Sequence, residues 1–452
     1  MAEAPGTVGE LLGRCLAALG ARRVFIAGSV ADVAPSTEMG LELHPVGEPG
    51  LAALLAAADG RLGPGPGVAL LDGRRVLLTS APGRYAGSLI STTSASTPGA
   101  LAGWTLGLVH AAVIYDLDLD LGAPAPAGLE PVVLDDRSDD LLTLSPTLAD
   151  FRTLVLVGPG VVRAGHLAGL RALAASMGCG VLNTYGAKGV FPWDDPHHFG
   201  TIGLQELDVE LSGLADAELV ITAGLDPTEL APERWSGSAQ VLEVEPWQLS
   251  TLAHHWPDPG PVPEPPPLYR ALSGALADRY PSDDVPLSPA RVVADLSAAL
   301  PPGGLVAADP GVAGLWVGRA FPTCQPGSVV VSSVAIPGVA AALALAAALV
   351  DRPAVAVTTD PLDPTSEAML DLARSWGRRL VVQVWTDRDG GDGLASSTTN
   401  PTTTATDHAA RLAEALTRPG VQRLDVPVTF ADTARLVDAA GPVVAWAEPS
   451  GR

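Results

Sequence analysis

The chain has 452 residues, enough for two or three domains that each bury a hydrophobic core of their own. Asp and Glu outnumber Lys and Arg by 50 to 27, and the resulting net charge of -23 argues against binding to nucleic acid. The 3 cysteines are widely spaced and form no CxxC motif, which argues against a disulfide framework and a cysteine-based zinc site. With no export signal at the N-terminus, we expect a cytoplasmic protein.

The first part of the chain alternates short apolar runs with a helical pattern. Residues 22–28 (RRVFIAG), 67–73 (GVALLDG) and 74–80 (RRVLLTS) are typical of buried strands. Alternation of this kind is the pattern of βαβ units, which form parallel sheets. We therefore predict a first α/β domain over residues 1–120, followed by an acidic, proline-bearing linker over 121–144.

The same alternation occurs twice more along the chain. Residues 153–178 read as a strand, a glycine-bearing turn and an amphipathic helix, and they begin a second predicted domain at 145–255. A proline-dense linker over 256–284 separates it from a third predicted domain at 285–452. The prediction is thus an α/β fold with three consecutive parallel-sheet domains.

Residues 329–350 form an apolar stretch that is about long enough to cross a bilayer. Its Ser-Ser and Pro-Gly interruptions favour a strand, a turn and a buried alanine-rich helix instead. We therefore expect no membrane partner.

Two motifs have both a functional and a purely structural interpretation. Residues 158–165 (GPGVVRAG) loosely match a dinucleotide-binding turn, but the glycines also suit any tight strand-to-helix turn. Function as a nicotinamide-dependent oxidoreductase is a further interpretation, and this motif is the only feature of the sequence that supports it. The histidine pairs at 197–198 and 254–255 could bind a metal, but adjacent side chains usually point apart, which favours turn or surface histidines.

A single glutamate, Glu48, opens an otherwise apolar helical segment over residues 47–71. A carboxylate at a helix N-terminus often only compensates the helix dipole. Three further segments favour a functional role for Glu48: 186–203 (GAKGVFPWDDPHHFGTIG), 214–224 (LADAELVITAG) and 305–316 (LVAADPGVAGLW). Together with Glu48, these segments resemble the thiamine-diphosphate (ThDP) enzymes of the acetolactate synthase type.

The resemblance implies a pyrimidine-binding domain, a central Rossmann-like domain and a diphosphate-binding domain. It makes Glu48 the catalytic residue that hydrogen-bonds the aminopyrimidine ring of ThDP. It also places Pro82 and Gly83 at a turn near the pyrimidine, and Gly311 near the diphosphate. Gly47 stands where the family usually has a histidine.

The family's metal and diphosphate motif would begin at Thr359 and Asp360 and end at Asp387. Asp360 and Asp387 offer the oxygen ligands that Mg²⁺ prefers. Pro361, however, has no N–H to donate to a phosphate. Ser332 stands where the family has the bulky apolar residue that bends the cofactor. The pyrimidine end of the predicted site is thus partly kept, and the diphosphate end is eroded.

Two functions follow from the resemblance. One is a Mg²⁺- and ThDP-dependent lyase or carboligase that acts on C–C bonds of a 2-oxo acid. The alternative is a non-catalytic structural or regulatory family member that pairs with a fuller, paralogous ThDP subunit. Either way the resemblance implies a homo-oligomer, a dimer or a tetramer, because the family's active sites lie between subunits.

Overall fold

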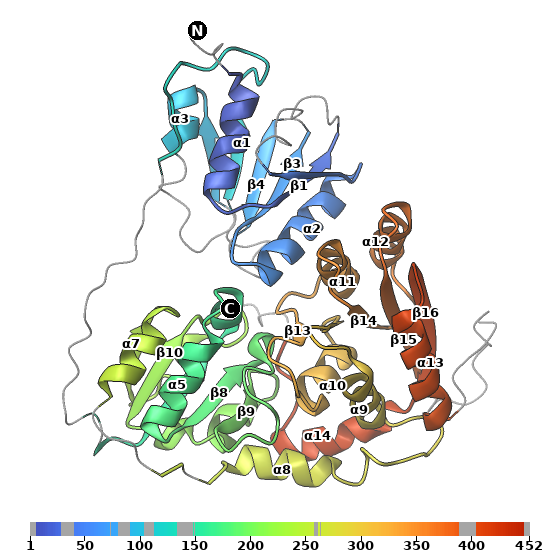
Figure 1. Ribbon diagram of the computed structural model, residues 1–452. Helices are drawn as coiled ribbons and strands as arrows, with labels where there is room; N and C mark the ends of the chain where they lie inside the picture. Colours follow the sequence, from blue (N-terminus) through green and yellow to red (C-terminus); the bar gives the residue numbers. More distant parts are fainter. Residues whose placement is uncertain are drawn as a thin grey trace, which may run out of the picture. The chain divides into compact units, whose positions relative to one another are not determined.

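A computed structural model describes residues 6–28, 40–72, 74–79, 91–103, 113–132, 148, 150–256, 261–262, 264–387 and 404–446 (Figure 1). The chain divides into two compact units, Met1–Asp140 and Leu141–Arg452. The first unit contains one β-sheet and the second contains two.

The sheet of the first unit has six strands in the order β2-β1-β3-β4-β6-β5. Most neighbouring strands run parallel, but β4 is antiparallel to both β3 and β6. The strands are β1 (Arg23–Ala27), β2 (Glu42–Pro45), β3 (Gly67–Leu71), β4 (Arg75–Thr79), β5 (Ser91–Ala95) and β6 (Val113–Leu117).

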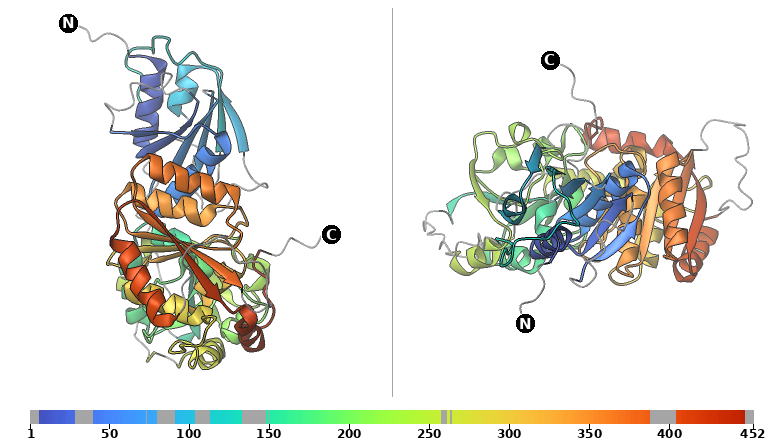
Figure 2. Two further views of the ribbon diagram at one scale, coloured as in Figure 1. Left: turned by 90° about the vertical axis from the view of Figure 1, so that its right-hand side faces the viewer. Right: turned by 90° about the horizontal axis from the view of Figure 1, so that it is seen from above.

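Helices cover both faces of this sheet. Helix α1 (Val8–Ala18) packs on one face with α3 (Pro98–Gly103), and α2 (Pro49–Leu62) lies on the other (Figure 2). The strands explain this arrangement, because successive side chains point to opposite faces. In β1, Val24 and Ile26 join the core beneath α1, and every residue of the strand is buried.

The second unit begins with a parallel five-stranded sheet in the order β11-β10-β7-β8-β9. Hydrophobic clusters on its two faces bury β8, β9 and β10 completely and β7 except for its first residue, whereas the edge strand β11 is mostly exposed. The elements of this part are β7 (Thr153–Val157), α4 (Pro159–Arg163), α5 (Leu167–Met177), β8 (Gly180–Thr184), β9 (His198–Ile202), α6 (Asp208–Leu211), β10 (Leu219–Ala223), β11 (Gln240–Val244), α7 (Gln248–His255) and α8 (Pro267–Leu276).

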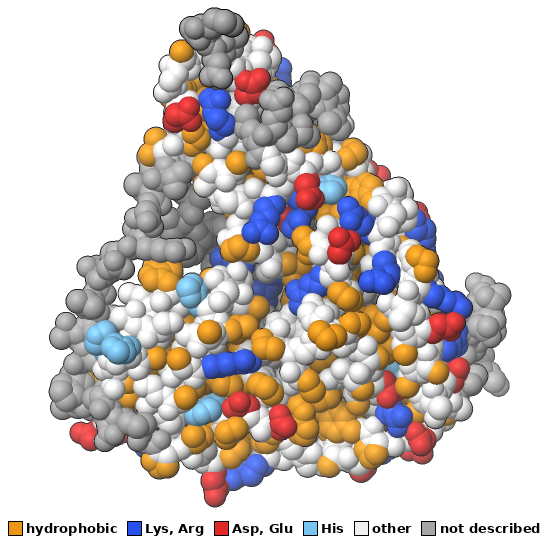
Figure 3. Space-filling model, in the orientation of Figure 1, with side chains coloured by type: hydrophobic (Ala, Val, Ile, Leu, Met, Phe, Trp, Pro, Cys, Tyr) orange, Lys and Arg blue, Asp and Glu red, His pale blue; other side chains and the backbone are white. Residues whose placement is uncertain are grey.

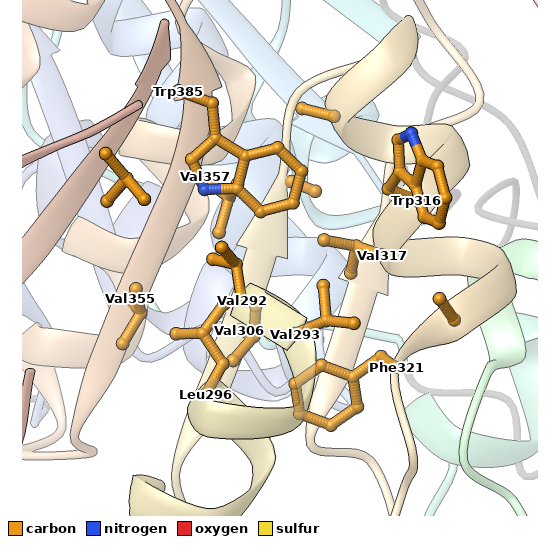
Figure 4. Close-up of a cluster of buried hydrophobic side chains, with 14 of the residues drawn as sticks. Val292, Val293, Leu296, Val306, Trp316, Val317, Phe321, Val355, Val357 and Trp385 are labelled. Carbon is orange, nitrogen blue, oxygen red and sulfur yellow. The ribbon is translucent and has the colours of Figure 1, made fainter. Parts of the chain in front are cut away.

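The third sheet is also parallel, in the order β13-β12-β14-β15-β16. Its core joins Val306, Val355 and Trp385 of the strands to residues of α9 and α10 (Figure 4). The elements are α9 (Pro289–Ala299), β12 (Leu305–Ala308), α10 (Val312–Ala320), β13 (Val329–Val331), α11 (Val339–Leu349), β14 (Ala354–Thr359), α12 (Pro364–Ser375), β15 (Leu380–Asp387), α13 (Ala405–Thr417), β16 (Val421–Val428) and α14 (Thr433–Ala440).

A buried ion pair connects the second and third sheets. Arg319 of α10 pairs with Asp208 of α6, and both side chains are 0% exposed. The Arg319 guanidinium also donates to Gln205 Oε1 at 2.8 Å and to the carbonyl of Thr201 at 2.5 Å. Asp208 Oδ2 accepts from the N–H groups of Leu204 and Gln205 at 2.8 and 2.9 Å. Both charges are therefore partnered within a hydrogen-bonded network that ties α10 to the central sheet.

Residues 329–350, the apolar stretch, form strand β13, a turn and helix α11, every residue of which is buried. Among the described residues, no helix is long and apolar enough to cross a membrane. The strand, turn and buried helix predicted from the Ser-Ser and Pro-Gly interruptions are thus confirmed.

The predicted α/β class with three mostly parallel sheets is confirmed, with one departure in the first sheet. Strands β3 and β4 were expected to be parallel but form an antiparallel pair. The connection from Leu71 to Arg75 is too short for a helical crossover, so the chain must reverse direction there. The boundaries at 1–120, 145–255 and 285–452 stay predictions.

Acidic and basic side chains are interspersed on the face of the molecule shown in Figure 3.

Candidate cofactor site at the third sheet

Acidic residues follow three neighbouring strands of the third sheet. Asp309 comes directly after β12, Asp360 directly after β14, and Asp387 is the last residue of β15. These strands are neighbours and run parallel, so their carboxyl ends lie at one edge of the sheet. This edge is where ligands bind in open α/β sheets, and it is the predicted diphosphate site.

Asp309 lies at the N-terminus of α11. Its Oδ1 accepts a hydrogen bond of 2.8 Å from the backbone N–H of Ala340, in the first turn of that helix. The side chain of Thr358, at the end of β14, also hydrogen-bonds to it. Free N–H groups at a helix N-terminus are the donors that would hold a phosphate. In this chain a carboxylate of the protein takes one of them.

A second carboxylate caps the neighbouring helix. Asp363 is the N-cap of α12, and its side chain accepts from the Ser366 N–H at 2.9 Å and from the Ser366 hydroxyl at 2.5 Å. Among the described residues, no lysine or arginine forms an ion pair with Asp309, Asp360 or Asp363. The edge is therefore acidic, and Asp309, Asp360 and Asp363 have no basic partner in the part of the chain that the structure describes.

The two predicted metal ligands, Asp360 and Asp387, end neighbouring strands and are both exposed. The N–H of Asp360 donates to the carbonyl of Trp385 at 3.0 Å, so the polypeptide stays bonded to β15 at this point. Within the described part of the chain, no group of three or more His, Cys, Asp or Glu side chains is placed to hold a metal ion. Their role in binding Mg²⁺ stays a prediction.

The three predicted diphosphate-side residues have different surroundings. Gly311 is the N-cap of α10, with φ +100° and open space where a side chain would lie, so a ligand could approach its backbone. Thr359 is the last residue of β14 and is half-buried. The Ser332 hydroxyl makes two hydrogen bonds of 3.2 Å to the backbone of Val334, which turns this small side chain onto its own loop.

The pyrimidine-side residues belong to the first unit. Glu48 is the N-cap of α2; its side chain is exposed and makes no capping hydrogen bond. It follows Gly47, whose φ of +90° favours glycine and whose α-carbon faces open space. Pro82 and Gly83 lie outside the described residues.

The glycines of residues 158–165 are explained by packing. A Cβ at Gly158 would lie 2.4 Å from the Gly224 carbonyl oxygen, and one at Gly160 would lie 2.7 Å from the Gly224 α-carbon. Two backbone segments therefore meet at this turn, as the structural interpretation predicts. The glycines of this motif are therefore not evidence for nucleotide binding.

The paired histidines make contacts that also suit a structural role. His197 Nδ1 lies 2.8 Å from the Cys179 carbonyl oxygen, and His255 Nδ1 lies 2.9 Å from that of Thr251. His198 is buried and packs edge-on against Tyr269. These contacts favour structural histidines, as their adjacent positions in the sequence predict.

The residues at this edge do not fit the diphosphate of ThDP. A diphosphate needs N–H donors or cations, whereas it would meet Asp309 at the start of α11 and Asp363 at the start of α12. Pro361 removes one further donor after β14. The backbone at Gly311, the N-cap of α10, is open.

The capping roles of Asp309 and Asp363 were not predicted from the sequence. For Asp363 a local signal exists, because an Asp followed by Pro at the first helical position is a common helix start. For Asp309 no local signal exists, because its partner Ala340 lies 31 residues away in the sequence.

The pKa of Asp309 is raised to about 6, chiefly by burial; the hydrogen bonds from Thr358 and Ala340 oppose this rise, and the Asp363 carboxylate adds to it. The folded protein then binds this proton more tightly than the unfolded chain does. The stability contribution is therefore complete below the ordinary pKa of 3.8 and is lost as the pH rises through about 6.

We therefore expect Asp309→Asn to stabilise the chain at pH 8, by at most about 3 kcal/mol, and to have little effect near pH 4. Asparagine keeps an oxygen for the Ala340 N–H and does not ionise. Denaturant unfolding at pH 4, 6 and 8 measures the difference, with the exposed Asp371→Asn as control. An equal effect of Asp309→Asn at all three pH values would contradict this prediction.

The architecture is that of an α/β protein with three mostly parallel sheets, and two comparisons relate it to ThDP-dependent enzymes. Residues 149–258 match the family model described as "Thiamine pyrophosphate enzyme, central domain". The sequence resemblance was most specific in this segment, and the resemblance to ThDP-dependent enzymes is confirmed there.

The whole chain also has a structural relative. A structure described as "X-ray structure of a putative thiamin diphosphate-dependent enzyme isolated from Mycobacterium smegmatis" superposes with a TM-score of 0.67. The match covers 94% of this chain and 100% of that chain at 16% sequence identity, so it shows a shared fold. A search of the curated proteins gave no match to this sequence.

Proposed function

We propose that this chain is a non-catalytic subunit of the ThDP-dependent enzyme class, which completes the cofactor site of a fuller subunit and does not hold ThDP itself. One observation carries the proposal: the Asp309 carboxylate lies on the N-terminus of α11, at the edge where the diphosphate would bind. The Asp309 carboxylate already occupies an N–H donor of this helix, and its negative charge would repel a diphosphate.

Electrostatics support the same conclusion. The diphosphate group is multiply charged, and the edge offers it the carboxylates of Asp309, Asp360 and Asp363 without a basic partner among the described residues. Like charges at short range in a partly buried site cost several kcal/mol unless a cation compensates them. The described residues place no cluster of metal ligands there that would supply such a cation.

The exposed position of Glu48 supports a role at a subunit interface. Its carboxylate caps no N–H of α2 and lies at the surface of the first unit. By the resemblance to the acetolactate synthase type, one subunit supplies this glutamate and another supplies the diphosphate clamp. A chain that keeps Glu48 and has lost the clamp is suited to donate the glutamate to a partner.

A second candidate is a Mg²⁺- and ThDP-dependent lyase or carboligase acting on a 2-oxo acid. Two observations favour it. Asp360 and Asp387 lie at the ends of neighbouring strands and offer the oxygen ligands that Mg²⁺ prefers, and the backbone at Gly311 is open to a ligand. In that function ThDP would supply the carbanion chemistry on the 2-oxo acid, and Glu48 would act on its pyrimidine ring.

We expect this chain to form an oligomer with itself when alone, a dimer or a tetramer, and to co-purify with a fuller ThDP subunit from the same source when the two are co-expressed. Sedimentation measures the first and affinity capture of one tagged subunit measures the second. A monomer of 46.0 kDa at micromolar concentration, together with no co-purification, would contradict the proposal.

A further inference from the structure

A cavity of about 390 Å³ lies in the second unit, away from the carboxyl edge of the third sheet. It is bordered by β9, by α8 and by the C-terminal end of α10, and Figure 1 shows α8 passing beneath these elements. The side chains that matter most for its chemistry are Lys188, His198, Tyr269, Tyr280, Arg319 and Phe321.

Lys188 is the only lysine of the chain and is 4% exposed. Among the described residues, no carboxylate or other acceptor forms an ion pair or a hydrogen bond with its ammonium group. The other cation of the cavity, Arg319, is fully engaged with Asp208, Gln205 and Thr201. The cavity therefore contains one buried positive charge without a partner.

A buried charge of this kind is costly unless an opposite charge accompanies it. Burial, with a smaller contribution from the charge of Arg319, lowers the pKa of Lys188 to about 7. An anion in the cavity would offset both effects and keep the ammonium group charged. A ligand that binds next to Lys188 should therefore be negatively charged.

The remaining walls are mostly apolar. The hydroxyl groups of Tyr269 and Tyr280 donate to the carbonyls of Trp193 and Ala320, at 2.9 and 2.8 Å, so both hydroxyls are already engaged. Burial lowers the pKa of His198 to about 3, so this imidazole is neutral at pH 7. Leu272, Leu276 and Phe321 add aliphatic and aromatic surface to the wall.

We propose that this cavity is a binding site for a small organic carboxylate, whose charged group pairs with Lys188 and whose apolar body packs among the tyrosines, Phe321 and the leucines. The volume suits a molecule of small-ligand size. The proposal does not depend on the proposed function, because none of the cavity residues belongs to the predicted ThDP site.

Phenylacetate and its amide, phenylacetamide, test the proposal on the full chain. They share an aromatic body and differ in charge. Calorimetry is expected to show one saturable site for phenylacetate and binding at least tenfold weaker for the amide. In protein labelled with ¹³C-lysine, the single side-chain ε-carbon signal of Lys188 should shift along the same saturation curve.

Two variants make the test specific. Lys188→Met removes the charge at similar size and is expected to weaken phenylacetate binding at least tenfold. Arg270→Met removes an exposed charge from α8, a helix that borders the cavity, but Arg270 does not line the cavity, so this variant should leave binding unchanged. Absent binding of phenylacetate, equal binding of acid and amide, or an unshifted Lys188 signal would each overturn the proposal. Inorganic phosphate that displaces phenylacetate at equal concentration would overturn the carboxylate assignment.

Discussion

Glu48→Gln is expected to lower the 2-oxo acid turnover of the complex between this chain and a fuller ThDP subunit by at least about 100-fold. The substitution removes the carboxylate that, in the proposed function, would steer the aminopyrimidine tautomer, and it keeps the size of the side chain. Because Glu48 is exposed and makes no capping bond, the substitution should leave α2 and the assembly intact. Product formation from a 2-oxo acid, by decarboxylation or condensation, is the measurement.

Glu42→Gln is the matched control, since Glu42 is an exposed glutamate of the same unit on β2. It should change neither turnover nor co-purification. A complex that forms normally but turns over equally fast with Glu48→Gln would show that this glutamate is only a charge at a helix start.

Asp208→Ala is expected to lower the free energy of unfolding of the second unit by about 3–5 kcal/mol. It leaves the guanidinium of Arg319 buried without its carboxylate, and it also removes the acceptor for two backbone N–H groups. Denaturant unfolding followed by hydrogen exchange in α10 resolves this unit from the first.

The double variant Asp208→Ala/Arg319→Met should be destabilised by less than the sum of the two single variants, because the unpaired charge is then absent. The exposed pair of Asp371 and Arg374 is the control: Asp371→Ala should cost less than about 1 kcal/mol. Equal effects of Asp208→Ala and Asp371→Ala would contradict the importance of the buried pair.

Much of the fold could be predicted because buried parallel strands appear in the sequence as continuous apolar runs. Strands β14 and β15 are examples, with Val355, Val357 and Val382 all buried. The antiparallel direction of β4 was missed because an apolar run does not show its direction. Only the short connection between Leu71 and Arg75 determines that.

The candidate site was less predictable, since its properties depend on contacts across the third sheet. The sequence places Asp360 and Asp387 at strand ends, and Pro361 already indicates a lost phosphate donor. It does not show that Asp309 takes the N-terminus of α11, or that Arg319 pairs with Asp208, 111 residues away. Such pairs become visible only when packing brings the helices together.

Binding of ThDP and Mg²⁺ to this chain alone tests the central claim most directly. Asp309 and Asp363 make this edge acidic and accept hydrogen bonds from the first turns of α11 and α12. We therefore expect ThDP with Mg²⁺ to cause no saturable shift in melting temperature relative to Mg²⁺ alone. A bound cofactor at a hundred times its dissociation constant would stabilise the fold by about 2.7 kcal/mol. A saturable shift of that size, abolished by Asp360→Ala, would contradict the account and establish this chain as a ThDP-binding subunit in its own right.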